Sequence, residues 1–310
     1  MSIGVIGYGS IGRRHAENLK KLGQEVRVYD PRLPNPGIEM DAEFVADRDA
    51  LAECRGLVIA SPGGSHADDM TFGIAHCLPM LVEKPLATSL EAARQLALQA
   101  EQEGVPVAAM FNLRQRKMVQ EAWLACQAHD LGQPVWAHFV CGSYLPDWRP
   151  GQDFRKGYAA DPVHGGVIFD NIHELDLACH FLGDGVVVNA AANSNGLLGL
   201  KSEELATIDV KHDNGCRSHI HLDYLSRPKC PRFTIGFQRG RLDVETSQAS
   251  YSLYCSSGEV LSQGSEPLNP NLEYVAVMNN FLGIIEGKTE PACPVKEALI
   301  SLSWATYARK

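Results

Sequence analysis

The chain has 310 residues, of which 45% are hydrophobic and 21% are charged, and this length supports about two compact domains with their own cores. The formal net charge of −9 comes from acidic residues scattered along the chain without any lysine or arginine block, which argues against a nucleic-acid or membrane partner and favours a small molecule. The nine cysteines include no C-x-x-C pair, no apolar run approaches the roughly 20 residues of a membrane span, and MSIGVIGYGS lacks the basic segment of a targeting signal, so we expect a cytoplasmic protein with reduced thiols.

The first third of the chain alternates short β-branched runs with longer helical patterns. Strands are predicted at IGVI (3–6), EVRVY (25–29), GLVIAS (56–61), MLVE (80–83) and VPVAAMF (105–111), and helices at 11–22, 65–77 and 88–103. This order favours a parallel sheet with helices on both faces. We therefore predict a doubly wound domain over residues 1–112.

The rest of the chain predicts a second α/β domain over residues 113–310. In chain order, the pattern predicts a helix at 115–129, the strand PVWAHFVCGS (134–143), a loop at 144–164, a helix containing GGVIFDNIHELD (165–176), alternating strands from 186 onward, and helices at 271–286 and 295–309. Stretches such as ATIDVKHD, RSHIHLDYL and SYSLYC are typical of a large, mostly antiparallel sheet with one solvent-facing side. The last helix, about 295–310, is a candidate to pack back on the first domain.

A glycine-rich turn lies between the first predicted strand and the first predicted helix. VIGYGSIG places Gly7, Gly9 and Gly12 in the G-x-G-x-x-G spacing. The first glycine permits a tight turn, the second lets a pyrophosphate approach the backbone, and the third lets helix and strand pack closely. Phosphates bind at such a helix N-terminus, here Ser10 and Ile11, because its N–H groups and dipole favour an anion. In this context the motif predicts a Rossmann domain that binds a dinucleotide, rather than a structural glycine turn.

An acidic residue stands at the end of the second predicted strand. Asp30 is placed to accept hydrogen bonds from the adenosine ribose and would repel a 2′-phosphate, which favours NAD. Arg32, two residues later, has the chemistry to pair with that phosphate, so NADP stays open as an alternative.

A charged pair, Glu83 and Lys84, ends the fourth predicted strand just before Pro85. At the carboxyl end of a central strand, such a pair faces the crevice where doubly wound folds bind their ligands. The alternative is a solvated strand end followed by a helix start, with Thr88 or Ser89 as the cap.

Taken together, GVIGYGSIGRRHAENL, IASPGGSH, Glu-Lys-Pro and GGVIFDNIHELDLACHFLG resemble the glucose-fructose oxidoreductase, inositol dehydrogenase and MocA (Gfo/Idh/MocA) family over nearly the whole chain. The resemblance implies a Rossmann domain followed by an α/β domain whose open sheet forms subunit contacts in a homodimer or homotetramer. It also implies oxidation or reduction of sugars, cyclitols and related diols with NAD or NADP. Lys84 would then touch both the nicotinamide side and the substrate oxygen. The residues implied to lie along the cofactor are Ser61, Pro62, His66 and Glu83.

The second-domain motif departs from the family pattern, in which three residues often separate the aspartate from the histidine. Here only two residues separate Asp170 from His173. On one helix, steps of three and four lie on neighbouring positions on opposite sides of the reference residue, so we expect Asp170 to enter the site from a different angle. Residues 142–176 resemble a subgroup with the same D-x-x-H-E-x-D spacing that is found in pathways for sialic-acid-like and other surface sugars.

The motif residues suit hydride transfer. His173, which titrates near neutrality, is the predicted general base for the hydroxyl proton. Lys84 would hold the developing oxyanion and shuttle its proton. Asp170 would orient the imidazole or bind a neighbouring hydroxyl, and Asp176 would support the helix. The alternative is a polar stripe beside an ordinary apolar helix face.

The loop 144–164 is too long and too rich in aromatic and charged residues for a simple connection. Trp148 and Tyr158 are candidates to stack on a sugar face, and Arg149 and Arg155 to bind a carboxylate or phosphate, which suits an acidic or nucleotide-linked sugar. The alternative is that they pin the loop to the sheet. Two further candidates for the substrate side, Asn112 and Arg114, resemble a family segment that follows the fifth strand.

The sequence thus predicts a sugar or polyol oxidoreductase that prefers NAD, with Lys84, His173 and Asp170 as the catalytic residues. HIH at 219–221 offers two imidazoles without an evident third ligand, so we expect no metal site. Two alternatives remain. One is a dinucleotide-binding sensor without turnover, and the other is an enzyme that retains NAD and catalyses a net non-redox epimerisation or elimination.

Overall fold

Short apolar runs in the first part of the chain form a parallel sheet. The computed structural model describes residues 2–33, 42–194, 196–269 and 271–310. Six described strands pair in the order β3 (Glu43–Phe44), β2 (Val26–Tyr29), β1 (Ile3–Ile6), β4 (Leu57–Ile59), β5 (Met80–Glu83) and β6 (Val107–Met110). Every neighbouring pair is parallel. Because β1, β5 and β6 are buried at each position, both faces of this sheet must be covered.

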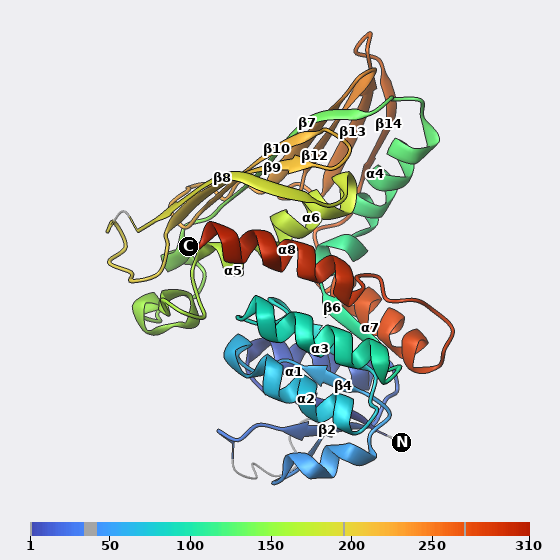
Figure 1. The fold of residues 1–310 in the computed structure, drawn as a ribbon, viewed down its shortest axis with the longest axis vertical. Helices are drawn as coiled ribbons and strands as arrows, with labels where there is room; N and C mark the ends of the chain where they lie inside the picture. The colour runs from blue at the N-terminus through green and yellow to red at the C-terminus, as the bar shows by residue number, and fades with distance from the viewer. Residues whose placement is uncertain (1, 34–41, 195, 270) are drawn as a thin grey trace. The chain divides into compact units, whose positions relative to one another are not determined.

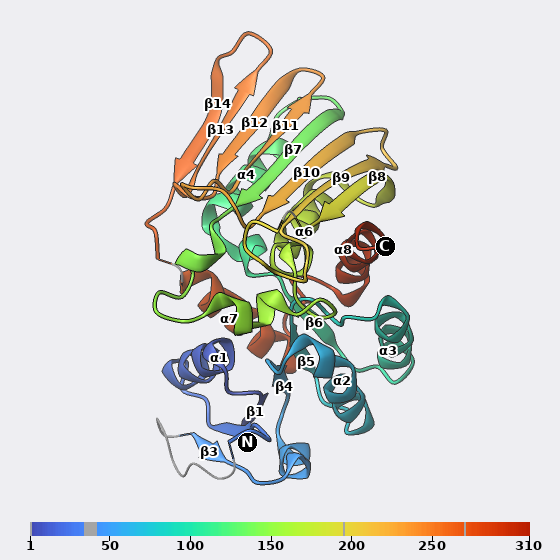
Figure 2. The same ribbon diagram turned by 90° about the vertical axis from the view of Figure 1, so that its left-hand side faces the viewer.

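Helices cover both faces of the parallel sheet. They are α1 (Ser10–Lys21), α2 (His66–Ala75), α3 (Leu90–Gln102) and α7 (Leu272–Ile285). Figure 2 shows α1 with α7 on one side and α2 with α3 on the other. Side chains of α7, including Met278 and Phe281, join the core of the first strands even though they lie far along the chain. The predicted doubly wound arrangement is confirmed, and its strand order is that of dinucleotide-binding sheets.

The second sheet is made mostly of antiparallel strands. Its eight described strands run β14 (Val260–Ser265), β13 (Ser250–Cys255), β12 (Gly240–Glu245), β11 (Arg232–Phe237), β7 (Pro134–Gly142), β10 (Arg217–Asp223), β9 (Leu205–His212) and β8 (Gly185–Asn193) (Figure 1). Only the described pair of β7 and β10 is parallel. In β7, Ala137 and Phe139 are buried while Trp136 and His138 are exposed, so the sheet has one covered and one open face. The predicted fold class is therefore confirmed.

Helices α4 (Lys117–Ala128) and α6 (Ile172–Leu182) pack on this sheet, α4 against β12 to β14 and α6 against β7 and β10. The two strands at the sheet edges, β8 and β14, lie within the region predicted to hold alternating strands from residue 186 onward, but their own sequences were not among the stretches named there. Edge strands are only half covered, and their many exposed positions weaken the apolar alternation that marks a strand. Within the described residues, no helix is long and apolar enough to cross a membrane.

The chain divides into two compact units. The first unit contains residues 1–115 and 270–299, and the second contains residues 116–269 and 300–310. The division that we drew at residue 112 placed all later residues in one domain. In the structure α7 belongs to the first unit, and α8 (Val295–Ala308) contributes its first residues to the first unit and the rest to the second.

The GGVIFDNIHELD segment is broken, which corrects the expectation of one continuous helix. A short helix, α5 (Val167–Asp170), ends at Asp170, and α6 begins at Ile172. Asn171 lies between them with φ −104° and ψ 28°. The geometry of steps along one helix therefore does not describe how Asp170 relates to His173.

Gly166 sets the entry to α5. Gly166 has φ +96°, and an ideal Cβ there would lie closer than 3.0 Å to the carboxylate of Glu203. That carboxylate is itself held by Arg309, with 3.2 Å between the guanidinium Nε and Glu203 Oε1. A side chain at position 166 would therefore meet both backbone strain and a fixed neighbour.

Gly166→Ala should lower the free energy of unfolding by about 1–3 kcal/mol, because a left-handed residue is strained and the Glu203 carboxylate must move. Gly151→Ala is the matched control, since Gly151 has φ +83° but no described atom within 4 Å of an ideal Cβ. It should cost only about 1 kcal/mol. Urea unfolding of both variants measures the difference. Equal losses would mean that the Glu203 contact does not constrain position 166.

Candidate functional site

Five predicted site positions in the first unit lie where the strands of the parallel sheet end, at their carboxyl ends. Gly7, Asp30, Ser61, Lys84 and Asn112 each come within two residues of the carboxyl end of a strand. Parallel strands place these ends at the same edge, and β1 and β4, which meet at the sheet centre, form the point where strand order reverses. Ligands of open α/β sheets bind there.

The glycine turn brings backbone segments together without side chains between them. An ideal Cβ on Gly7, which has φ +90°, would lie 2.6 Å from the carbonyl oxygen of Ala60. One on Gly12 would lie closer than 3.0 Å to the carbonyl oxygen of Gly7. In contrast, an ideal Cβ on Gly9 meets nothing within 4 Å among the described atoms, and Gly9 is exposed. Gly7 and Gly12 are required for packing, and Gly9 leaves open space over the backbone.

The start of α1 is suited to an anion. Gly9 is the N-cap, and no side chain in the described part of the chain caps the helix. The first intrahelical bond runs from the Arg13 N–H to the Gly9 carbonyl, so the N–H groups of Ser10, Ile11 and Gly12 precede the helical hydrogen-bond ladder. Such N–H groups and the positive end of the dipole favour phosphate oxygens. The open backbone and the uncapped helix fit the pyrophosphate of a dinucleotide.

The carboxylate of Asp30 is held at the end of β2. It is 6% exposed and accepts hydrogen bonds from the Tyr8 N–H at 2.8 Å and the Arg32 N–H at 2.9 Å. The guanidinium of Arg32 donates to both carboxylate oxygens, at 3.1 and 3.0 Å. Burial raises the pKa of Asp30, but the hydrogen bonds from Arg32 and Tyr8 outweigh it and leave the pKa below its ordinary value. Asp30 is therefore ionised, and Arg32 is paired with it.

A buried histidine joins the ends of β4 and β5. His66, the first residue of α2, is 1% exposed, and its ring nitrogens lie 2.9 Å from the carbonyl oxygens of Pro85 and Ser61. Ser61 donates its hydroxyl to Asp69 at 2.6 Å, and Pro62 is exposed. With both nitrogens at backbone carbonyls, His66 supports the sheet edge, a task that the sequence did not suggest.

Glu83 connects the end of β5 to α1, the helix that follows the glycine-rich turn. Its Oε1 lies 2.7 Å from Nε2 of His15, which is fully buried on α1. Its Oε2 accepts the N–H of Lys84 at 3.1 Å, and the Lys84 side chain is half-buried. His15 was missed from the sequence, although it lies in GRRHAENL, because its partner is 68 residues away. The contact fixes the residue just before Lys84.

The structure places Asn112 and Arg114 against the returning C-terminal segment. Asn112 donates to Glu273 at 2.8 Å, and Arg114, which is 3% exposed, pairs with Glu297. Both carboxylates belong to residues 270–299 of the first unit. Both side chains thus have a structural task in addition to the substrate contact that the resemblance implied.

In the second unit, Asp170 accepts a hydrogen bond from the hydroxyl of Tyr224, which is completely buried. His173 is the second residue of α6 and is half-buried. The indole of Trp148 meets the Tyr224 ring edge-on, with centroids 5.6 Å apart. Tyr158 is 39% exposed, yet desolvation of its hydroxyl, together with the charge of Asp170, raises its pKa well above its usual range. Two of the four predicted loop residues therefore lie around Asp170.

The other two predicted loop residues, Arg149 and Arg155, are both exposed. Arg155 donates from Nε to the carbonyl oxygen of Leu198 at 3.3 Å. The end of the loop is held by Arg309, whose guanidinium donates to the carbonyl oxygens of Pro162 and Val163, each at 3.0 Å. Arg309 was missed because it is the second-last residue of the chain and lies in no motif.

Glu174, the motif residue that directly follows His173, is buried. Burial raises its pKa to about 7, although a hydrogen bond with Cys141 and the charge of Lys229 favour the ionised form. Asp176, a further motif residue, is completely buried. In the HIH segment, where we expected no metal site, His219 lies 2.7 Å from Asp209 and His221 lies 2.9 Å from Asp223. Each ring therefore has a carboxylate partner.

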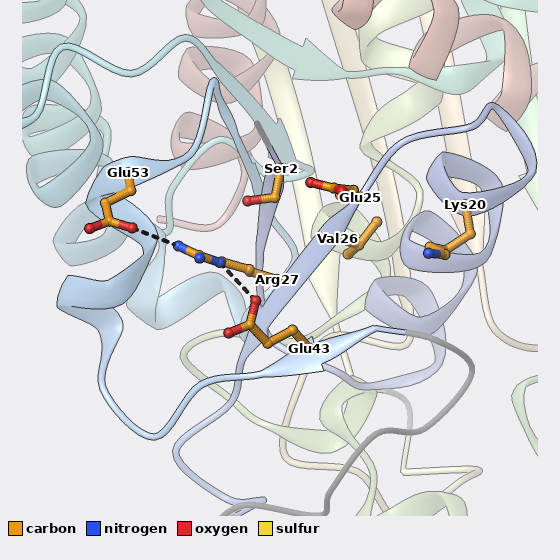
Figure 3. A pocket seen from close by; sticks show the side chains of 7 residues that line it. All are labelled: Ser2, Lys20, Glu25, Val26, Arg27, Glu43 and Glu53. Atoms are coloured by element: carbon orange, nitrogen blue, oxygen red, sulfur yellow. Dashed lines mark hydrogen bonds and ion pairs between the residues drawn. The ribbon is translucent and has the colours of Figure 1, made fainter.

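A separate cavity of about 480 Å³ lies at the opposite, amino-terminal edge of the parallel sheet (Figure 3). Its lining includes Ser2 and Val26, where β1 and β2 begin. Arg27 projects across it and pairs with Glu43 at 2.9 Å and Glu53 at 3.1 Å. None of the predicted site residues lines this cavity, and three of its charged side chains, Arg27, Glu43 and Glu53, are already paired with one another.

Comparison with known families matches both parts of the chain. Residues 1–111 match the model described as "Oxidoreductase family, NAD-binding Rossmann fold". Residues 119–243 match the model described as "GFO/IDH/MocA C-terminal domain".

Named relatives include sugar dehydrogenases and reductases. D-apiose dehydrogenase of Rhizobium rhizogenes is 27% identical over 197 residues, which is 63% of this chain and only about half (54%) of that protein. 1,5-Anhydro-D-fructose reductase of Ensifer adhaerens is 24% identical over 266 residues, or 84% of this chain and 77% of that protein.

Solved structures share the fold over the full chain. UDP-N-acetylglucosamine 3-dehydrogenase GnnA from Acidithiobacillus ferrooxidans superposes with a TM-score of 0.83 at 22% identity, covering 100% of this chain and 96% of that one. Levoglucosan dehydrogenase, solved with NADH and levoglucosan, gives 0.86 at 13% identity with the same coverage.

Gly9→Ala should weaken NADH binding at least 10-fold while lowering the free energy of unfolding by less than about 1 kcal/mol, because a methyl group there fills only the space left for a pyrophosphate. Gly12→Ala is the matched variant. It should destabilise the first unit by more than 1 kcal/mol, since its methyl group meets the Gly7 carbonyl. Fluorescence titration and urea unfolding measure the two effects. If Gly9→Ala binds NADH normally, the pyrophosphate does not lie over Gly9.

The free energy of unfolding should fall as the pH rises from about 4.5 through about 7, because folding raises the pKa of Glu174 to about 7. In this pH range the unfolded chain has already lost the Glu174 proton, whereas the folded protein must either keep it or bury a charged carboxylate. Glu174→Gln should flatten this slope, while Glu91→Gln, on an exposed position of α3, should keep it. Urea unfolding at several pH values between about 5 and 8 tests this. An unchanged slope in Glu174→Gln would contradict it.

Proposed function

The chain belongs to the Gfo/Idh/MocA family of oxidoreductases, and from this premise we propose that it is an NAD-preferring dehydrogenase acting on a secondary alcohol or ketone carbon of a carbohydrate. The observation that carries the proposal is the cradle at the start of α1. It has an open backbone at Gly9, an uncapped helix N-terminus and an ionised carboxylate at Asp30. Lys84 follows a strand of the same sheet.

The first unit has the residues to hold NAD, which when bound accepts or supplies the hydride. The N–H groups of Ser10, Ile11 and Gly12 would bind the pyrophosphate, and Asp30 would accept hydrogen bonds from the adenosine ribose. The pairing of Arg32 with Asp30 supports NAD over NADP, because this arginine is engaged by a carboxylate. Ser61, Pro62 and Glu83 surround the same strand ends.

We assign the proton chemistry to three residues, on the chemical grounds given by the sequence. His173 takes the hydroxyl proton of the alcohol as general base. The ammonium of Lys84 donates to the same oxygen and stabilises the negative charge that develops on it. Asp170, fixed by Tyr224, binds a neighbouring hydroxyl or orients the imidazole.

The proposed substrate is a sugar, sugar acid, nucleotide sugar or polyol. Arg149 and Arg155, both exposed on the loop, support an acidic or nucleotide-linked member of this class. The named relatives act on apiose and anhydrofructose, which supports the carbohydrate class.

We further propose that the chain forms a homodimer or homotetramer in the cytoplasm. Large apolar side chains on the open face of the second sheet support self-association, since Trp136 is 40% and Val186 62% exposed. All nine cysteines, each within the described residues, are free thiols, which suits a reducing compartment.

Two alternatives are less favoured. A sensor without turnover would need the dinucleotide cradle but neither Lys84 nor His173. An enzyme that retains NAD for a net non-redox step would return its cofactor to the starting redox state in each cycle. The dehydrogenase and reductase names of the relatives support net redox chemistry.

Titration with NADH and NADPH, followed by a screen of plain, acidic and nucleotide-linked sugars for absorbance change at the nicotinamide band, tests the proposal. We expect tighter NADH binding and turnover on one sugar class. Lys84→Ala should lower kcat at least 100-fold while the NADH Kd changes less than about threefold, because the lysine acts on the substrate oxygen.

Lys20→Ala, which removes an amino group at the opposite edge of the sheet, is the control and should keep kcat. Turnover of Lys84→Ala at the wild-type rate would refute the catalytic assignment. NADH binding without turnover on any sugar class would favour the sensor.

A further inference from the structure

Asp170 is held by a residue that belongs to none of the motifs. Tyr224 directly follows β10 and is completely buried, and its hydroxyl donates a hydrogen bond to Oδ2 of Asp170. Burial and the neighbouring charge of Asp170 raise the pKa of Tyr224 well above its usual range. The hydroxyl therefore keeps its proton and acts as a donor to the carboxylate.

The backbone of Tyr224 is fixed on both sides. Its N–H donates to the carbonyl oxygen of Glu204 at 2.9 Å, and its own carbonyl accepts the N–H of Leu145 at 3.1 Å. The ring meets the edge of Trp148, with an interplanar angle of 87°, and the indole N–H of Trp148 donates to Ser143 Oγ at 2.9 Å. The position of the phenol oxygen is thus set by the residue just before β9, by the loop and by the residue just after β7.

The break in the motif helix is what presents Asp170 to this tyrosine. α5 packs against β9 and β10 and ends at Asp170. Asn171, which forms the break, accepts a hydrogen bond from Cys141 Sγ on β7 at 3.4 Å, so the break itself is anchored to the sheet. The shortened spacing between Asp170 and His173 coincides with this arrangement.

We propose that Tyr224 is a positioning residue for Asp170, and this proposal rests on the proposed function. A hydrogen bond from a neutral donor favours the ionised carboxylate and fixes which way it points. Asp170 therefore meets the substrate as an oriented hydrogen-bond acceptor, and the loop tryptophan contributes through the ring of Tyr224. The other groups around the Asp170 and Tyr224 pair are Tyr158, Glu203 and Arg309.

Tyr224→Phe tests the proposal because it removes one oxygen and leaves the ring. The matched control is Tyr251→Phe on β13, where another buried tyrosine, 6% exposed, shares a 3.0 Å hydrogen bond with Ser262. Both variants lose one hydrogen bond and should lower the urea midpoint, Tyr224→Phe by the larger amount because its partner is a carboxylate. Only Tyr224→Phe should lower kcat/KM for the carbohydrate, by about 10- to 100-fold. The NADH Kd should stay within about twofold in both.

Asp170→Asn completes a double-mutant cycle. If Tyr224 acts through Asp170, Tyr224→Phe should change kcat/KM less than about threefold in the Asp170→Asn background. Additive effects of the two substitutions, or kinetics of Tyr224→Phe that match Tyr251→Phe, would overturn the positioning role.

The same cycle measured by urea unfolding separates this proposal from the proposed function. Suppose that Tyr224→Phe and Asp170→Asn are coupled in unfolding but the wild-type protein turns over no carbohydrate. The contact between the two side chains would then be confirmed, and both the dehydrogenase activity and the positioning role that depends on it would be refuted. Absence of coupling in unfolding, with a wild-type protein that turns over its sugar, would overturn the positioning role alone.

Discussion

The close approach of α1 to the end of β1 is the constraint on which the first unit depends. It is possible only because Gly12 lacks a side chain where the helix crosses the Gly7 carbonyl, and because Gly7 lacks one where the turn crosses Ala60. Bare backbone therefore joins the first helix to two central strands. The absence of a side chain also leaves open space next to the exposed backbone of Gly9. One local feature thus provides both the packing of the sheet and the open space in which we propose that a pyrophosphate binds.

Polar contacts then hold the sheet edge around that turn. The Glu83 carboxylate joins His15 on α1 to the backbone of Lys84, and His66 joins the ends of β4 and β5. The charged side chain that we propose to meet the reacting oxygen has to be held in place, because misplacement by about 1 Å costs catalysis heavily. The second unit uses the same principle. A buried tyrosine holds Asp170, and an arginine near the chain end holds the loop before it.

Features that depend on neighbouring residues were predictable from the sequence, and features that depend on distant partners were not. The glycine spacing, Asp30 after its strand and the alternation of strands and helices that makes a parallel sheet follow from local periodicity and turn chemistry. The break at Asn171 depends on contacts with β7, and the roles of Asn112 and Arg114 depend on carboxylates more than 160 residues later. Tyr224 looked like an ordinary strand end, because its partner lies 54 residues earlier. No local signal marks such pairs.

Isotope transfer tests the central claim, that this chain moves a hydride between nicotinamide and a carbohydrate carbon, most directly. NADH carrying deuterium at C4 would be incubated with the protein and the keto forms of plain, acidic and nucleotide-linked sugars, and the reduced sugar would be analysed by mass spectrometry. The account predicts one deuterium on the new carbinol carbon of one sugar class when the label occupies the transferred face of the nicotinamide. The account would be contradicted if NADH binds but its deuterium stays on the nicotinamide with every sugar, whichever of the two C4 hydrogens is labelled.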